Sequence, residues 1–153
     1  MTRSSTLPPE IRVLEREAPV ALFKGEVRAL AAALYQNERP LRGLAGQLDW
    51  HFRGWVSRAI RAGAMSGEPG ECVYVPMNRH GRVLHLLFVG GGHSDRPGSR
   101  PPLPEVSLAA LRRNLRSLKL ESVGVSRADL GGASDHDLKG LFSQAGGAGW
   151  ILP

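Results

Sequence analysis

"RPLRGLAGQLDWHFRGWVSRAIRAG", residues Arg39–Gly63, decides the fold because its apolar residues recur at the spacing of one helical face. Arginines lie off this face, and Gly63 stands where a left-handed residue would end the helix. Gly43, Gly46 and Gly54 each weaken a helix by up to about 1 kcal/mol relative to alanine, and we interpret them as points of close approach to another backbone. The pattern predicts one amphipathic helix of about five turns that covers a sheet face. Its apolar residues are Leu41, Leu44, Leu48, Phe52, Trp55, Val56, Ala59 and Ile60.

Three further segments have the residue pattern of strands. Ile11–Glu17 and Cys72–Met77 alternate between two faces, as half-buried strands do. Arg82–Gly90 is apolar on both faces apart from His85, so we expect a central strand with His85 as a hydrogen-bonded core histidine. The intervening residues Asn78–Gly81 are turn-forming and predict a hairpin.

The C-terminal half alternates helices and strands. Residues 106–123 place leucines on one helical face, with Ser107 as a candidate N-cap. A short strand at residues 122–126 precedes a helix with Ser134 as its N-cap, and the last residues, "GWILP", predict another strand. Residues 29–35 remain open, since alanine favours a helix and an unbroken apolar run favours a buried strand. The whole order predicts an α/β fold with a mixed sheet flanked by helices.

The composition is that of an ordinary soluble globular protein. We expect a flexible tail at residues 1–9 and a single domain over residues 10–153. No apolar run approaches the roughly 18 to 20 residues that span a bilayer, and the N-terminus lacks the apolar core of a signal peptide. Cys72 is the single cysteine, which excludes an internal disulfide, and we expect it to be buried and inert. These features predict a cytoplasmic protein that does not bind a membrane.

An excess of arginine gives the chain a formal net charge of +6. Arginine suits phosphate because its planar group forms paired hydrogen bonds. The same excess is typical of a GC-rich genome, and no block of five like charges occurs, so we favour a general surface bias over a nucleic-acid footprint. Nucleic-acid binding stays an alternative function, with candidate contacts at Arg42, Arg53, Arg58, Arg61, Arg112, Arg113 and Arg116.

The helical segment and its neighbours resemble the N-terminal domain of the cytosolic leucine aminopeptidase family. Members share an Arg-Pro-Leu start, an Ala-Gly pair, an Asp-Trp pair, a Gly-rich turn and a strand that ends in glycines. The similarity covers roughly residues 26–92. The matching positions are Arg39, Pro40, Leu41, Gly43, Ala45, Gly46, Asp49, Trp50, Gly54, Ser57, Gly67, Gly70, Glu71 and the glycines after Val89.

This resemblance implies a macrodomain-like fold, with a strand at residues 29–35. In that family the peptidase chemistry uses two metal ions in a larger C-terminal domain, and no motif of that domain maps onto this sequence. The resemblance therefore implies a chain that is not an enzyme, needs no cofactor or metal, and acts as a non-catalytic protein-interaction or regulatory module. We expect a protein partner or a homo-oligomer. Trp50 and Trp150 are the candidate interface residues, although the family motif favours packing for Trp50.

A glycine-rich stretch after the central strand is the candidate ligand loop. Such a loop can bring backbone N–H groups close to an anion, and macrodomains hold ADP-ribose with loops of this sort. Neither GxGxxG nor GxxxxGK[ST] is present, so we favour a sharp exit from the sheet over a ligand loop. ADP-ribose or nucleotide binding is retained as an alternative function, with Gly90, Gly91, Gly92, His93 and Asp95 as candidate residues.

Overall fold

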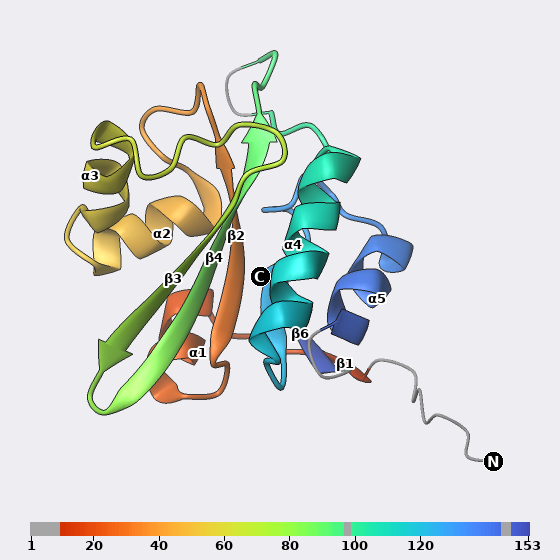
Figure 1. The fold of residues 1–153 in the computed structure, drawn as a ribbon. Helices are drawn as coiled ribbons and strands as arrows, with labels where there is room; N and C mark the ends of the chain where they lie inside the picture. The colour runs from red at the N-terminus through yellow and green to blue at the C-terminus, as the bar shows by residue number, and fades with distance from the viewer. Residues whose placement is uncertain (1–9, 97–98, 145–147) are drawn as a thin grey trace.

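A mixed sheet of six strands forms the centre of the molecule, in the order β1-β6-β5-β2-β4-β3 (Figure 1). The computed structural model describes residues 10–96, 99–144 and 148–153, so the predicted tail at residues 1–9 lies outside the described residues. β3 runs antiparallel to β4, and the other neighbouring strands are parallel. The strands are Glu10–Val13 (β1), Ala29–Tyr35 (β2), Cys72–Arg79 (β3), Arg82–Gly92 (β4), Val123–Ser126 (β5) and Ala148–Leu152 (β6).

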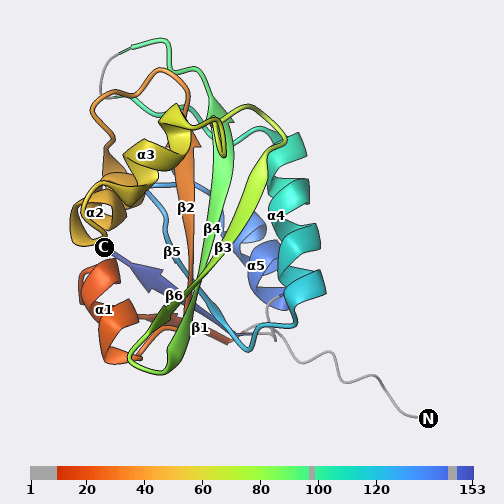
Figure 2. The same cartoon turned by 60° about the vertical axis from the view of Figure 1, so that its left-hand side comes forward.

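Helices cover both faces of this sheet, which confirms the predicted fold class (Figure 2). One face carries α1, α2 and α3, and the opposite face carries α4 and α5. Their bounds are Ala18–Lys24 (α1), Gly43–His51 (α2), Trp55–Arg61 (α3), Glu105–Leu118 (α4) and Asp135–Gln144 (α5). No helix in the described part of the chain is long and apolar enough to cross a bilayer.

β2 is buried along its whole length because its side chains alternate between two cores. Ala29, Ala31, Ala33 and Tyr35 pack with the leucines of α4 and α5. The intervening residues, Leu30 among them, pack with α1, α2 and α3. The open assignment of residues 29–35 is thus resolved as a strand, because two-sided burial outweighs the helical propensity of alanine.

The single long helix predicted at Arg39–Gly63 is instead two helices, α2 and α3, with a break between them. Arg53 and Gly54 take left-handed backbone angles there, with φ of 56° and 82°. Asp49 then caps α3: its Oδ1 accepts from the Ser57 N–H at 2.9 Å and its Oδ2 accepts from the Ser57 hydroxyl at 2.6 Å. The apolar pattern therefore identified the covered face of the sheet but not the interruption.

Of the two predicted N-cap residues, one is confirmed and the other is wrong. Ser134 does cap α5, because its Oγ accepts from the Asp137 N–H at 3.1 Å. Ser107 is not an N-cap: α4 begins at Glu105, and the buried Ser107 hydroxyl donates to the Gly90 carbonyl at 2.6 Å. The predicted β3–β4 hairpin is confirmed, with its turn at residues 80 and 81.

The end of β4 packs tightly against the segment before β3. A Cβ atom added at Gly90 would lie 1.8 Å from the carbonyl oxygen of Glu68. The glycine after Val89 therefore serves close contact between two backbones, and a side chain there would force them apart.

Gly90→Ala is expected to lower the free energy of unfolding by about 3 kcal/mol, because the clash is with backbone that cannot rotate away. Gly140→Ala in α5 is the matched control, since the nearest atom to its added Cβ is 3.9 Å away, and alanine should stabilise that helix by about 0.5 to 1 kcal/mol. Urea unfolding of both variants measures the difference. Equal effects of the two substitutions would refute the packing argument.

Candidate functional site at the carboxyl edge of the sheet

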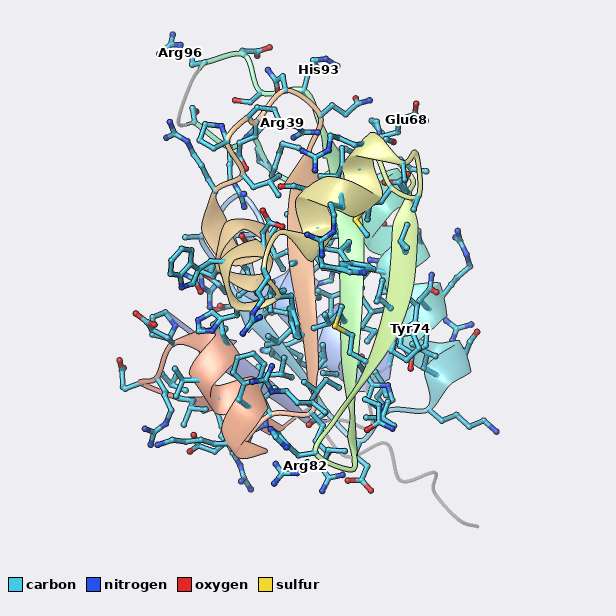
Figure 3. All side chains as sticks on the ribbon, turned by 90° about the vertical axis from the view of Figure 1, so that its left-hand side faces the viewer. Arg39, Glu68, Tyr74, Arg82, His93 and Arg96 are labelled. Atoms are coloured by element: carbon cyan, nitrogen blue, oxygen red, sulfur yellow. The ribbon has the colours of Figure 1, made fainter. Side chains whose placement is uncertain are left out.

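The parallel strands bring several chain segments together at one edge of the sheet. β2, β4, β5 and β6 run in the same direction, so the residues that follow them emerge at the same edge. In open α/β sheets this carboxyl edge is the usual place for a ligand. Arg39, His93 and Arg96 lie at this end of the molecule, opposite Arg82 in the β3–β4 hairpin (Figure 3).

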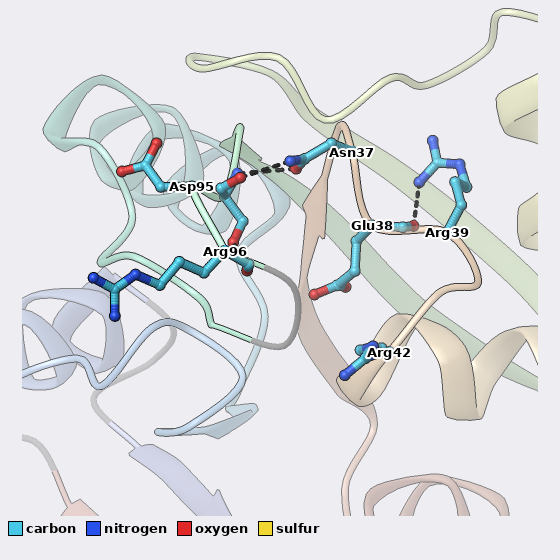
Figure 4. Close-up of a pocket in the computed structure, with 7 residues that line it drawn as sticks. Asn37, Glu38, Arg39, Arg42, Asp95 and Arg96 are labelled. Carbon is cyan, nitrogen blue, oxygen red and sulfur yellow. Dashed lines mark hydrogen bonds between the residues drawn. The ribbon is translucent and has the colours of Figure 1, made fainter.

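Two adjoining hollows among the described residues at this edge share part of their lining. The first, the arginine hollow, has a volume of about 240 Å³, and its two walls come from the segments after β2 and after β4 (Figure 4). Hydrogen bonds join the walls: the Asn37 amide donates to the Ser94 carbonyl at 2.6 Å, and the Ser94 N–H donates to the Asn37 side-chain oxygen at 2.9 Å. The lining residues are Asn37, Glu38, Arg39, Arg42, Ser94, Asp95 and Arg96.

The second hollow, the Asp129 hollow, has a volume of about 250 Å³ and shares Glu38 and Arg42 with the first. It is bounded by the start of α2, the segment after β5 and the last residue of the described chain. Its lining residues are Glu38, Arg42, Gly43, Leu44, Gln47, Arg100, Ser126, Ala128, Asp129 and Pro153.

Asp129 connects the sheet to α2 at the base of the second hollow. Its Oδ2 accepts from the Ala33 N–H of β2 at 2.9 Å, and its Oδ1 accepts from the Leu44 N–H in the first turn of α2 at 2.8 Å. Burial raises the pKa of the Asp129 carboxyl, and the Arg100 guanidinium together with these two N–H groups opposes that rise. The Asp129 carboxylate lies at the N-terminus of α2, where the helix dipole favours a negative charge.

Arg100 lies between the two carboxylates of the hollow. It donates to both oxygens of Glu38, at 2.6 and 3.0 Å, and to Oδ1 of Asp129 at 2.6 Å. It also donates to the Arg42 carbonyl at 2.9 Å, and its guanidinium carbon lies 4.8 Å from the centre of the Tyr35 ring. One side chain therefore cross-links the segments after β2 and β5 and the start of α2.

The predicted ligand loop is only partly at this site. Gly90, Gly91 and Gly92 are buried within β4 and line neither hollow. Asp95 does line the arginine hollow, while His93 is exposed at the same end of the molecule. The glycines serve packing: a Cβ at Gly91, for example, would meet the Tyr35 ring at 2.4 Å.

Sequence reasoning missed the residues that organise the site, namely Glu38, Arg100 and Asp129. Glu38 directly precedes the Arg39-Pro40-Leu41 start of the family motif, but Arg100 and Asp129 lie outside that motif. The available signal for Glu38 and Asp129 was their position, because each lies three residues after a strand segment, at residues 29–35 and 122–126, where a parallel sheet collects its loops. Arg100 lies ten residues after the predicted strand that ends at Gly90 and carried no such signal.

The candidate nucleic-acid arginines do not form one surface. The group before Ala62 lies with α2 and α3, and the group in α4 lies on the opposite face of the sheet. Several have partners within the chain: Arg112 pairs with Glu105 at 2.6 Å, and Arg116 donates to Gln144 at 2.8 Å. Of the seven, Arg42 lines both hollows.

The two candidate interface tryptophans differ in exposure. Trp50 is 81% exposed on α2, so the family-based expectation of packing is wrong for it. Trp150 is half-buried, with the Arg12 guanidinium carbon 5.4 Å from its ring centre. Whether either one contacts a partner stays a prediction.

Cys72 and His85 are accounted for without a ligand. Cys72 is half-buried, and burial raises the pKa of its thiol to about 12. His85 Nδ1 lies 2.6 Å from the Tyr74 hydroxyl, and burial lowers the pKa of the imidazole. Among residues 10–96, 99–144 and 148–153, no group of three or more His, Cys, Asp or Glu side chains could hold a metal ion.

Comparison with solved structures shows that the fold is macrodomain-like. The macrodomain of Mycobacterium tuberculosis DarG matches with a TM-score of 0.65 and 18% identity, over 94% of this chain and 97% of that chain. Thermosipho africanus DarTG, in complex with ADP-ribose, matches with a TM-score of 0.60 and 13% identity, over 94% of this chain and 42% of that one. A tomato leucine aminopeptidase mutant matches with a TM-score of 0.59 and 17% identity, over 99% of this chain and 34% of that one. No protein-family model matches the sequence, and no curated protein does.

These structures contradict the prediction that the chain is not an enzyme. That prediction rested on a likeness to one part of a peptidase without its catalytic half. The chain instead matches a DarG macrodomain over nearly the full length of both, and a related structure was solved with ADP-ribose. The absence of peptidase motifs from this sequence therefore does not decide whether the chain has an activity.

Asp129→Ala is expected to lower the free energy of unfolding by about 3 kcal/mol, because it removes one of the two carboxylate partners of the buried Arg100 guanidinium and leaves the Ala33 and Leu44 N–H groups unbonded. The control is Asp135→Ala, which removes an exposed partner of Arg127 and should cost less than about 1 kcal/mol. Thermal and urea unfolding measure both. A loss for Asp129→Ala as small as that of the control would show that the network does not hold the site together.

Proposed function

We propose that this chain binds ADP-ribose, or a nucleotide that contains it, at the carboxyl edge of its sheet. The observation that carries the proposal is the near-complete coverage by macrodomain structures, one of which belongs to a protein solved with ADP-ribose. The hollows at the carboxyl edge lie where open α/β sheets bind nucleotides.

The charges of the arginine hollow support an anionic ligand. Arg39, Arg42 and Arg96 line it, against Glu38 and Asp95. The Arg42 and Arg96 guanidinium groups form no hydrogen bond or ion pair with the part of the chain that the structure describes, so both are available to a ligand. Guanidinium groups bind phosphate oxygens through paired, charge-assisted hydrogen bonds.

Calorimetric titration with ADP-ribose tests the proposal. Arg42→Ala is expected to weaken binding by about tenfold or more, since a hydrogen bond to a charged group contributes about 1.5 to 3 kcal/mol. Arg61→Ala, at the end of α3, removes the same charge without touching either hollow and should bind like the unchanged protein. Absence of both heat and thermal shift with millimolar ADP-ribose would refute the proposal.

The same protein preparation can be tested for an activity. Incubation with ADP-ribosylated protein or nucleic acid, followed by detection of free ADP-ribose, distinguishes a binder that cleaves its ligand from one that does not. Arg42→Ala should reduce any release in proportion to its loss of binding, whereas release that persists unchanged in this variant would place the activity elsewhere.

We propose as a second function a protein contact through α2, as in an interaction or regulatory module that resembles the aminopeptidase N-terminal domain. The 81% exposed indole of Trp50 is the observation that favours it, because large exposed aromatic side chains are common at the centres of interfaces.

Trp50→Ala should therefore reduce self-association or partner binding without changing the melting temperature by more than a few degrees. Light scattering of the purified protein, unchanged and variant, measures the assembly. Arg61→Ala, at the exposed end of α3, is the control for a general surface effect, because Arg61 does not line the hollow beside Trp50. A protein that is monomeric at all concentrations, and retains no partner on a pull-down, would exclude this function.

A further inference from the structure

The N-terminus of α2 already holds an anion that belongs to the chain. The Asp129 carboxylate accepts from the Leu44 N–H, and it lies directly on the helix backbone: a Cβ added at Gly43 would be 2.3 Å from Oδ1. A phosphate group of a ligand cannot occupy the same space. The phosphates of an ADP-ribose-type ligand must therefore be held by side chains further out, and the arginine hollow supplies them.

The carboxylates of the Asp129 hollow would repel such a ligand. The side chains of Glu38 and Asp129 are 8% and 2% exposed, so water screens their charges poorly. Both line the hollow that adjoins the arginine hollow, and Glu38 lines both. If no positive group neutralised them, these two carboxylates would repel a diphosphate bound in the neighbouring arginine hollow.

Arg100 compensates these charges. Its side chain is 11% exposed and forms ion pairs of 2.6 Å with each carboxylate. Four arginine and three carboxylate side chains line the two hollows together, so the net charge of these side chains is +1, and it falls to zero without Arg100. Arg100 is the one of these arginines that pairs with both Glu38 and Asp129 among the described residues.

We propose that Arg100 is a positioning residue for the ligand. By neutralising Glu38 and Asp129, it allows the diphosphate of an ADP-ribose-type ligand to lie against Arg42 rather than at the N-terminus of α2. Arg100 acts through the carboxylates and does not itself hold the phosphates. This inference rests on the proposed function, and it assigns the diphosphate to the arginine hollow.

The test is a charge cycle measured with two probes, ADP-ribose and inorganic pyrophosphate, by calorimetry at neutral pH. Arg100→Gln should weaken the binding of both probes by about tenfold, because it removes one positive charge at short range. The double variant Glu38→Gln, Arg100→Gln should regain most of that loss, because it removes a repelling carboxylate together with its partner. Arg100→Lys keeps the positive charge, so it should bind both probes nearly as tightly as the unchanged protein. The control is Glu105→Gln with Arg112→Gln, an exposed pair on α4.

The outcomes separate this inference from the proposed function. Pyrophosphate binding that follows the cycle, without ADP-ribose binding, supports the charge role of Arg100 and refutes the proposed function. ADP-ribose binding that Arg100→Gln leaves unchanged supports the proposed function and overturns the inference. The inference is also overturned if the double variant Glu38→Gln, Arg100→Gln and the variant Arg100→Lys both bind as weakly as Arg100→Gln. Arg100 would then have a purely structural role, which a lowered melting temperature of these variants would confirm. Binding of neither probe by the unchanged protein overturns both.

Discussion

The carboxylate of Asp129 is the contact on which the carboxyl edge depends. β2 and β5 are neighbours in the sheet, yet their paired register consists of Leu30 with Gly124. Further along β2, the Ala33 N–H bonds to the Asp129 side chain in place of a strand backbone. The same carboxylate caps α2 through Leu44. The Asp129 side chain thus supplies a hydrogen-bond acceptor to β2 beyond its pairing with β5, and it connects α2 to the sheet at that point.

Much of the architecture could be predicted from the sequence because it follows from burial. The apolar run in β4 and the turn-forming residues before it gave the hairpin, and the leucines of α4 gave a covering helix. Ser134 gave the start of α5 through a local cap. These features depend on residues close together in the chain, so a single sequence contains the information.

The rest depends on contacts between distant residues, which periodicity does not encode. Asp129 meets Ala33 and Arg100 meets Glu38 across long stretches of chain. The break between α2 and α3 has a local cause at Gly54, but the apolar residues keep their spacing across it, so the pattern continued where the helix did not. Gly90 and Gly91 looked like a ligand loop because their packing partners, Glu68 and Tyr35, come from other segments.

The backbone hydrogen bonds between two strands are available to every residue except proline, so a substitution acts on a strand pair mainly through the packing of its side chains. The seam between β2 and β5 is different near its carboxyl end, where a side-chain carboxylate replaces the ladder. The stability of this contact between β2 and the segment after β5 therefore depends on single residues, Asp129 and Arg100. A related sequence with another residue in place of Asp129 would change the width of the Asp129 hollow while the backbone hydrogen bonds of the other strand pairs stay in place.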